Sequence, residues 1–451
     1  MKGPASKYVA SFSLLYFLQF AVWGCYLTCL GQLLGAGGLG RDIAWFYAAV
    51  GFVSLVMPAL MGHIADRYVS PARLLGLCHG AAALAMLAAW RYAMTHPMMD
   101  FAPFFGLYVL FLAFYMPTMA LANTTAFGIL KSRGLRPVDV FPRIRVWGTV
   151  GFVAAMWFVN SAYWHDGAFG FTLSDAGPMS TFRFQYTPMQ LLSSSVIGFV
   201  TAFYTLSLPC VRPMAQQSTG LGEHFREMFT FFRNAPVRTF LLLAALSGVC
   251  LQISNGFATP FISSFMADPA YAGTLAAGNA TMLFSLSQIS EAVCVLFVGW
   301  CMKRFGIRSV LITALVAWAL RFLLFAFGNP GGGLWMLIGS MLVYGVAFNF
   351  LTIAGNIYMD QSSAPERRGL GQGMLMLMSN GIGASLGTLC AGGVVNSFCH
   401  WQQVSTESGA TMRLFIGDWQ SAWLIFSAYS LTVALLYFIC FRPAKTPKVN
   451  S

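Results

Sequence analysis

Charged residues are scarce in this sequence, because Asp, Glu, Lys and Arg together make up only 9% of its 451 residues. Soluble domains carry about 25% charged residues, so this composition excludes an ordinary soluble protein. Hydrophobic residues make up 57% of the chain and occur in long blocks, many of which exceed the roughly 20 residues that span a bilayer core. A transmembrane β-barrel would show short alternating segments instead. The sequence therefore predicts an all-α membrane protein with many spans.

Residues that build catalytic or metal centres are also few. The six histidines are scattered without a ligand pair, and the ten cysteines lie almost entirely within hydrophobic blocks. Their spacing indicates neither a disulfide framework nor a zinc site, so packing is the expected role of the cysteines. A membrane enzyme would need a nucleophile–base or metal set, and a membrane sensor would need a signalling domain, for which the tail after Phe441 leaves no room. We therefore expect no enzyme, no metal and no cofactor.

The hydrophobic blocks predict twelve membrane spans in two groups of six. The predicted spans are 9–33, 42–65, 72–95, 101–130, 141–162, 188–209, 237–266, 275–302, 308–328, 333–358, 369–397 and 419–441. The longest polar break separates the sixth span from the seventh. We expect an N-terminal six-helix bundle over 1–209, a cytoplasmic central loop over 210–236, and a C-terminal six-helix bundle with a short tail over 237–451. The outer loop 163–187 is expected to be irregular.

The distribution of basic residues predicts the orientation in the membrane. Most of the 26 Lys and Arg residues lie in segments on the same side as the N-terminus. The opposite side holds only Arg41, Arg91, Arg183 and Arg413, while Arg145 and Arg321 lie inside spans. Because cytoplasmic segments are enriched in Lys and Arg, both termini are expected in the cytoplasm. This topology accounts for the net charge of +12 without a nucleic-acid partner. Arg321 is expected to be structural or to extend its charge to the membrane surface.

A weak internal repeat supports two related halves. The segment "GHIADRY" (62–68) follows the second span, and "GWCMKRF" (299–305) follows the eighth. The first segment resembles the loop signature of the major facilitator superfamily, Gly-x-x-x-Asp-Arg. Glycine at position 62 would let two helices approach closely, and the pair Asp66 and Arg67 would lock the cytoplasmic end when that side is closed. We therefore predict a conformational gate at Gly62, Asp66 and Arg67, in a protein whose substrate site lies between the halves.

Polar side chains near the centres of four spans form sets at helical spacing. Such residues are costly in a bilayer and usually face a cavity or a partner helix. The sets are Arg145, Thr149 and Phe152 in the fifth span, Gln252 and Asn255 in the seventh, Gln288 and Glu291 in the eighth, and Tyr344, Phe348 and Asn349 in the tenth. Because the sets occur in both halves, they are predicted to line a central substrate site. Each residue also has an alternative role in bonding or packing neighbouring helices.

The chemistry of these residues indicates a substrate class. Amide side chains pair with a donor–acceptor edge, as Asn and Gln do with a base, and aromatic faces suit a flat ring. Thr149, Glu291 and Asn349 have groups that bind hydroxyls. A nucleoside combines a flat ring, an amide-like edge and ribose hydroxyls. A sugar or another small polar solute stays open as an alternative, although it would use fewer of the amides.

Long stretches of the chain resemble the nucleoside:proton symporter family of the major facilitator superfamily. The similarity is densest at "YFLQFAVWGCYLTCLG", "FPRIRVWGTVGFVAAMW", "LQISNGF", "SLSQISEAV", "VYGVAFNF" and "DWQSAWLIFSAYS". The resemblance implies nucleoside uptake driven by a proton gradient, in the cytoplasmic (inner) membrane of a bacterium, by a protein expected to be a monomer in the lipid bilayer. It also implies nucleoside contacts for Arg145, Thr149, Gln252, Asn255, Gln288, Glu291, Tyr344 and Phe348. Where a relative in this family has Asp after that Phe, this chain has Asn349, so a proton-coupling role of that acid does not transfer.

Glu291 is then the one carboxylate in the middle of a span. Burial raises the pKa of a carboxyl group and a nearby arginine lowers it, so a group between these influences is suited to take up and release a proton. Our hypothesis is that Glu291 binds substrate and couples transport to protons. Two alternatives are that Glu291 only accepts hydrogen bonds from substrate in a proton-independent facilitator, or that it is a structural partner of Arg145.

Overall fold

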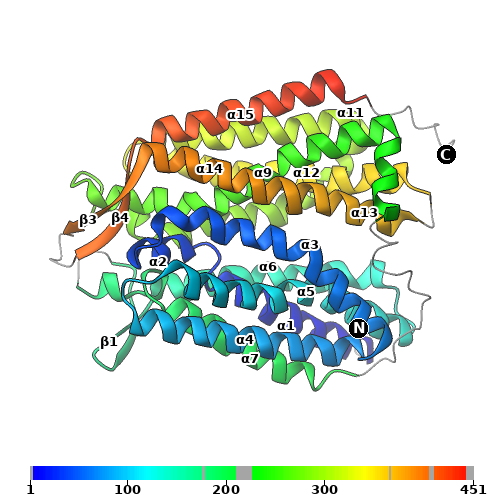
Figure 1. The fold of residues 1–451 in the computed structure, drawn as a ribbon, viewed down its shortest axis with the longest axis horizontal. Coiled ribbons are helices and arrows are strands. Elements are labelled where there is room, and N and C mark those ends of the chain that lie inside the picture. Colours follow the sequence, from blue (N-terminus) through cyan, green and yellow to red (C-terminus); the bar gives the residue numbers. More distant parts are fainter. Residues whose placement is uncertain (1–3, 175–177, 210–225, 365–366, 406–410, 443–451) are drawn as a thin grey trace.

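The computed structural model describes residues 4–174, 178–209, 226–364, 367–405 and 411–442, and these parts are mainly helical (Figure 1). The helices of the first half are α1 (Pro4–Gly24), α2 (Leu30–Ala36), α3 (Ile43–Arg67), α4 (Pro71–Thr95), α5 (Phe101–Ser132), α6 (Pro137–Ser161) and α7 (Met189–Thr205). The longer helices of the second half are α9 (Ala235–Ser264), α11 (Ala280–Phe327), α12 (Leu334–Ser362), α13 (Arg368–Met376), α14 (Ala384–Phe398) and α15 (Trp419–Cys440).

The described helices contain the twelve predicted spans. Eight of the described helical segments are long and apolar enough to cross a membrane. One of them, α11, crosses twice, because its backbone turns at Gly306 (φ 78°, ψ 161°), and Arg321 Nη1 in its second part donates to Ser287 Oγ in its first part at 3.2 Å. The remaining crossings are α1 with α2, the charge-bearing α6 and the 17-residue α7. The all-α, twelve-span prediction is confirmed.

The first predicted span is not one continuous helix. Residues 25–29 form turns between α1 and α2, and the carbonyl groups released there find new donors. Tyr47 Oη donates to the Leu27 carbonyl oxygen at 2.5 Å, and the hydroxyl of Thr259 donates to the Thr28 carbonyl oxygen. A helix break inside a membrane is tolerated when neighbouring helices satisfy the freed backbone groups. The predicted span 9–33 therefore contains a break near its outer end.

The Gly-rich eleventh span also changes its geometry along its length. Between α13 and α14 lies the π-helical segment η7 (Leu377–Gly383). A Cβ atom on Gly383 would clash with the carbonyl oxygen of Ala245 in α9, so the backbones of η7 and α9 are in direct contact. Glycine is required at this contact because any side chain would separate the two helices.

The outer loop at 163–187 contains regular structure, contrary to the prediction. Strand β1 (Ala162–His165) pairs antiparallel with β2 (Ala168–Phe171). The two residues between them, Asp166 and Gly167, both have positive φ values, 48° and 79°, as a type I′ hairpin turn requires. An Asp-Gly pair is a strong hairpin signal, and it was overlooked in the sequence. The loop continues through the 3₁₀ segments η2 (Pro178–Phe182) and η3 (Phe184–Tyr186).

A second hairpin precedes the last helix. Strands β3 (Cys399–Ser405) and β4 (Thr411–Gly417) pair antiparallel. Helix α15 then begins after Asp418, whose carboxylate accepts a hydrogen bond from the Ser421 backbone N–H at 3.0 Å and so caps the helix. Hydrogen bonds from the hydroxyl and the backbone of Ser421 hold the pKa of Asp418 below its usual value.

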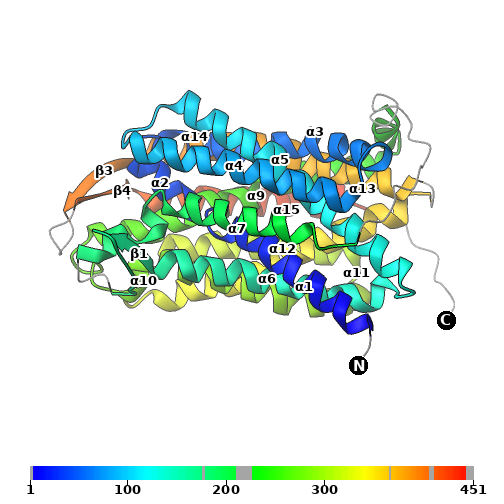
Figure 2. The ribbon, with the colours of Figure 1, turned by 90° about the horizontal axis from the view of Figure 1, so that it is seen from below.

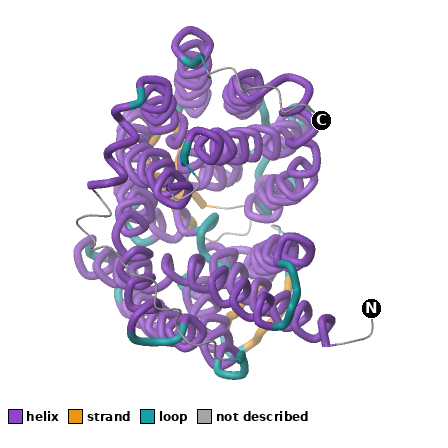
Figure 3. Tube along the Cα trace, turned by 90° about the vertical axis from the view of Figure 1, so that its right-hand side faces the viewer, coloured by secondary structure: helices purple, strands orange, loops and turns teal. Residues whose placement is uncertain are grey.

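Helices α1–α7 pack mainly on one another, and α9–α15 do the same. The start of α1 and the end of α15 lie at one end of the molecule, and the two hairpins lie at the other (Figures 1 and 2). We call these the terminus end and the hairpin end. From the terminus end, the helices form two groups (Figure 3). The proposed limits 1–209, 210–236 and 237–451 remain a prediction, because 210–225 lie outside the described residues.

The buried apolar residues show how the two halves meet. One large cluster combines residues of both halves, for example Tyr26 and Phe152 with Phe257 and Trp423. Two other clusters stay within one half each: one includes Phe12 and other residues of the first half, and one includes residues of the second half up to Phe441. These two clusters lie toward the chain termini. Within the described residues, the halves thus share a core toward the hairpin end and have separate cores toward the terminus end.

Candidate functional site

Helix α6 contributes the arginine of the candidate site. The Arg145 guanidinium lies over the ring of Phe20 from α1, with 4.2 Å between the guanidinium carbon and the ring centroid. Thr149, one turn further along α6, is partly exposed. Phe152 is buried in the core that both halves share, so packing is at least part of its role.

Helix α1 contributes residues that the sequence analysis did not select. Besides Phe20, Tyr16 lies close enough to Arg145 for an electrostatic interaction, and the Tyr16 hydroxyl donates to Asn123 Oδ1 of α5. Tyr16 and Phe20 are four residues apart and therefore lie on one face of the helix. That spacing was a usable signal, but aromatic residues are too frequent in this chain for it to stand out.

Helix α9 contributes the predicted pair of amides. Asn255 Nδ2 donates to Gln252 Oε1 at 3.2 Å, and Gln252 Nε2 donates to the backbone carbonyl of Tyr47 in α3 at 3.5 Å. Gln252 therefore contacts the opposite half of the protein, although a hydrogen bond of this length is weak. The pair partly serves helix–helix bonding, which was the alternative role considered for it.

The first crossing of α11 and helix α12 contribute the largest group. Tyr344 and Phe348 stack in parallel, with ring centroids 5.7 Å apart and an interplanar angle of 3°. The Tyr344 phenol interacts with the Gln288 side chain and, electrostatically, with Glu291. Phe348, Gln288 and Glu291 are partly exposed, whereas Tyr344 is buried. The structure thus brings these four predicted residues together on neighbouring helices.

Asn349 lies beside Glu291 but contacts its backbone. The Asn349 Nδ2 group donates to the carbonyl oxygen of Glu291 at 2.6 Å, and the side chain is 5% exposed. The amide therefore links α12 to α11 and acts there as a hydrogen-bond donor. A carboxylate at this position would have no proton to donate.

Arg145 and Glu291 lie in different halves and are close enough for an electrostatic interaction, but the two side chains form no direct salt bridge. A cation from one half and an anion from the other thus lie on either side of the bundle interface, near the Tyr344–Phe348 stack. This arrangement can bind a neutral molecule that carries both hydrogen-bond donors and acceptors.

The predicted gate is at the terminus end of the first half. Arg67 is exposed and lies over the ring of its neighbour Tyr68. A Cβ atom on Gly62 would meet no atom within 4 Å. Nothing is described for the side chain of Asp66. The gating role of Gly62, Asp66 and Arg67 stays a prediction.

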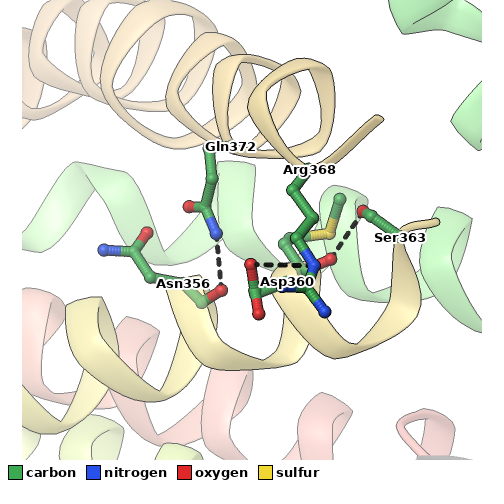
Figure 4. Close-up of polar contacts among 6 residues, drawn as sticks. Asn356, Asp360, Ser363, Arg368 and Gln372 are labelled. Atoms are coloured by element: carbon green, nitrogen blue, oxygen red, sulfur yellow. Dashed lines mark hydrogen bonds and ion pairs between the residues drawn. The ribbon is translucent and has the colours of Figure 1, made fainter. Parts of the chain in front are cut away.

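A polar group at the terminus end of the second half joins α12 to α13 (Figure 4). Arg368 Nε lies 3.5 Å from Asp360 Oδ1, and Gln372 Nε2 donates to the Asn356 carbonyl oxygen at 2.7 Å. Asn356 and Arg368 are exposed, and Asp360 and Gln372 are partly exposed. The group therefore belongs to the surface of the molecule and lies apart from the candidate site. Among the described residues, no three His, Cys, Asp or Glu side chains come together as metal ligands.

We predict that Phe20→Leu weakens substrate binding through Arg145. A cation–π contact contributes about 0.5–2 kcal/mol, so the half-saturation concentration for uptake should rise by roughly 2- to 30-fold. Uptake kinetics of the variant would measure this. The matched control is Phe17→Leu, the same substitution on α1 at a residue whose ring makes no cation–π contact with Arg145. An equal change in both variants would contradict a specific role for Phe20.

The two bundles together provide twelve membrane spans, and polar and aromatic side chains of both bundles lie at their interface. These features define a membrane transport protein of the major facilitator fold. The chain belongs to the nucleoside H⁺ symporter family, whose model matches residues 7–446.

Individual relatives match the chain over almost its whole length. It is 34% identical to the nucleoside permease NupG of Escherichia coli K12 over 439 residues, which is 95% of this chain and 94% of NupG. It is 33% identical to the xanthosine permease of the same organism, covering 96% of this chain and 95% of that protein. The crystal structure of the nucleoside transporter NupG superposes with a TM-score of 0.80 at 33% identity, covering 96% of this chain and 99% of that one. The resemblance inferred from the sequence is therefore confirmed.

Proposed function

We propose that this protein takes up nucleosides together with protons across the cytoplasmic (inner) membrane of a bacterium. The observation that carries the proposal is the electrostatic interaction of Arg145 from one bundle with Glu291 from the other, near the stacked rings of Tyr344 and Phe348. A nucleoside has a flat ring for the aromatic pair and ribose hydroxyls and base edges for the charged and amide groups. The names of two relatives, a nucleoside permease and a xanthosine permease, support this substrate class.

In this proposal, each predicted residue has a role in holding the nucleoside. The amides of Gln252, Asn255 and Gln288 read the edge of the base, and Arg145, Thr149 and Glu291 bind hydroxyls or base oxygens. Tyr344, Phe348 and Phe152 confine the flat ring. Asn349 acts on the substrate indirectly, because its amide group holds the backbone of Glu291. Glu291 is the proton-coupling group.

Transport would proceed by alternating access, with the two six-helix bundles rocking around the site in a monomer. The shared core at the hairpin end and the separate cores at the terminus end support a conformation that is closed on one side. With both termini in the cytoplasm, the closed side is the outer one. Gly62, Asp66 and Arg67 would close the cytoplasmic side in the opposite conformation.

The test is uptake of labelled uridine into proteoliposomes, with and without an imposed inward proton gradient. Accumulation above equilibrium only with the gradient would support symport. Uptake that stops at equilibrium in both conditions would indicate a facilitator, an alternative that the absence of an acid at position 349 favours. If uridine is not taken up, a panel of other nucleosides and then of sugars decides between a different substrate and a wrong proposal.

The closed outer side makes a separate prediction. Asn160 Nδ2 of α6 donates to Asn279 Oδ1 at 2.6 Å, and Trp157 Nε1 donates to Ser285 Oγ at 2.8 Å, so α6 is bonded to the start of α11 across the two halves. Asn160→Ala removes the bond to Asn279 and leaves the Met282 backbone N–H without its Asn160 Oδ1 acceptor. An unpaired buried donor costs about 1–3 kcal/mol, so the substitution should shift molecules toward the outward-open state.

Faster backbone hydrogen exchange at residues 275–285 would report this shift. Ser161→Ala is the control, because Ser161 Oγ bonds only to carbonyl groups of its own helix. Unchanged exchange in Asn160→Ala would show that this pair does not hold the outer side closed.

A further inference from the structure

Arg321 is fully buried inside the second half. Its side chain is 0% exposed, so it does not extend to the surface as one of the sequence-based expectations allowed. Nε and Nη2 donate to Ser254 Oγ of α9 at 3.2 and 2.8 Å. Nη1 donates to Ser287 Oγ in the first crossing of α11 at 3.2 Å and to the Ser340 carbonyl oxygen of α12 at 2.6 Å. One guanidinium therefore joins three other helical segments.

No carboxylate compensates this charge within the described residues. The guanidinium of Arg321 contacts the hydroxyl and carbonyl acceptors named above and the sulfur of Met341. It also lies near the rings of Tyr344, Phe325 and Phe284, whose centroids are 4.8, 5.0 and 5.6 Å from the guanidinium carbon. Burying a charge without an ionic partner is expensive, and an apolar side chain of similar size would fill the space at lower cost. Packing alone therefore does not account for an arginine at this position.

The contacts of Arg321 fall beside the residues of the candidate site. Ser254 precedes Asn255, and Ser287 precedes Gln288. Another contact, Tyr344, is itself a site residue. Arg321 lies over the Tyr344 ring, Trp318 meets the same ring nearly edge-on with centroids 5.7 Å apart, and Phe348 stacks on it. Because these contacts surround the ring, they restrict the orientation of Tyr344 and of the phenylalanine stacked on it.

We propose that Arg321 is a positioning residue of the nucleoside site. It does not touch the substrate, but it holds Tyr344 and the segments that carry Asn255 and Gln288 in the geometry that binds the nucleoside. The inference rests on the proposed function, since it assigns Arg321 to the proposed nucleoside site. Arginine is required because its planar group offers five donors in a fixed fork, whereas lysine offers a single ammonium. A lysine would keep the charge but would not bond to Ser254, Ser287 and Ser340 at once.

The test is binding of labelled uridine to the purified full-length protein, which gives both the dissociation constant and the number of sites per molecule. For Arg321→Gln and Arg321→Lys we expect a dissociation constant at least tenfold higher with an unchanged number of sites. The matched control is Arg308→Gln on the same helix. The Arg308 guanidinium bonds to the Phe438 carbonyl oxygen and lies over the Phe438 ring. We expect this variant to bind uridine with wild-type affinity. A purely structural role would instead lower the number of sites or the melting temperature and leave the affinity of the folded fraction unchanged, which would overturn the proposal.

A double-mutant cycle with Tyr344→Leu tests whether Arg321 acts through the ring. Residues that act through one another are not additive, so adding Arg321→Gln to Tyr344→Leu should raise the dissociation constant by a smaller factor than Arg321→Gln does in the wild-type protein. Fully additive effects would overturn this route.

If Arg321→Gln does not fold, the combined variant Ser254→Ala and Ser287→Ala takes its place. A dissociation constant at least threefold higher supports the proposal, and an unchanged one overturns it. If the wild-type protein binds no nucleoside, the proposed function itself fails. If the wild-type protein binds nucleoside and the Arg321 variants bind it equally well, only the role of Arg321 is overturned.

Discussion

Glu291→Gln is expected to give a protein that brings uridine only to equilibrium, even when an inward proton gradient is imposed. Glutamine keeps the size and a hydrogen-bond acceptor of the glutamate, but it has no titratable proton. Glu291 is the carboxylate whose charge interacts with Arg145 of the opposite bundle. If its protonation couples the proton gradient to the closure of the bundles, the variant can still exchange substrate but cannot accumulate it. The change leaves Arg145 without its opposite charge, so the rate of uptake and the affinity should fall as well.

The measurement is the ratio of internal to external uridine at steady state, because this ratio is independent of the rate and of the amount of active protein. The matched control is Asp139→Asn, the same loss of a carboxylate at an exposed residue that is paired with Arg136 at 2.7 Å, and it should accumulate uridine normally. Accumulation by Glu291→Gln at the wild-type ratio would rule out Glu291 as the coupling group. In that case Glu291 would only accept hydrogen bonds from substrate or balance the charge of Arg145.

Asn349→Asp is expected to slow uptake strongly at neutral pH and to recover part of the rate at acidic pH. The amide of Asn349 donates a 2.6 Å hydrogen bond to the Glu291 carbonyl oxygen. An ionised aspartate cannot donate, and the two oxygens would repel each other beside the candidate site. Loss of a buried hydrogen bond with an unpaired partner costs about 1–3 kcal/mol, which corresponds to roughly 5- to 150-fold in rate. A protonated aspartate can donate again, and this is why acid should restore function.

Initial rates of uridine uptake between pH 5 and pH 8 would measure this effect. Asn349→Ala should be slow at every pH, because it lacks the donor in all states. Asn356→Asp, the same substitution on the same helix at an exposed residue, should follow the wild-type profile. If Asn349→Asp matches wild type at neutral pH, the hydrogen bond to Glu291 has no part in transport.

Much of the fold was predictable from the local sequence. Twelve apolar blocks predicted the spans because a bilayer imposes a minimum length on each helix, and the polar segment around 210–236 separated two groups of six. Local rules missed the break at 25–29, because the groups that satisfy its free carbonyls, Tyr47 and Thr259, are distant in the sequence. The β1–β2 hairpin was a different failure, since the Asp-Gly signal at 166–167 was present and was not used.

The candidate site was predictable in part. Its polar members stood out because amides, an arginine and a carboxylate are rare in apolar spans, and the structure brings Gln288, Glu291, Tyr344 and Asn349 together. Phe20 was missed because an aromatic residue in a membrane span is ordinary until a guanidinium is found above its ring. Arg321 stood out in the sequence, but its spacing gave no sign that it would reach Ser254 and Ser340 on other helices.

The sequence alone determined the class of the protein, the number of its spans and the kinds of groups available to a substrate, because these follow from residue type and from periodicity along one helix. Tertiary structure decided which of these groups act together. The opposition of Arg145 and Glu291, the donation by Asn349 to a backbone carbonyl and the support of Tyr344 by Arg321 all join residues on different helices. Their geometry depends on how the helices pack. The spacing of residues within one span does not indicate which residues of another span will lie beside them.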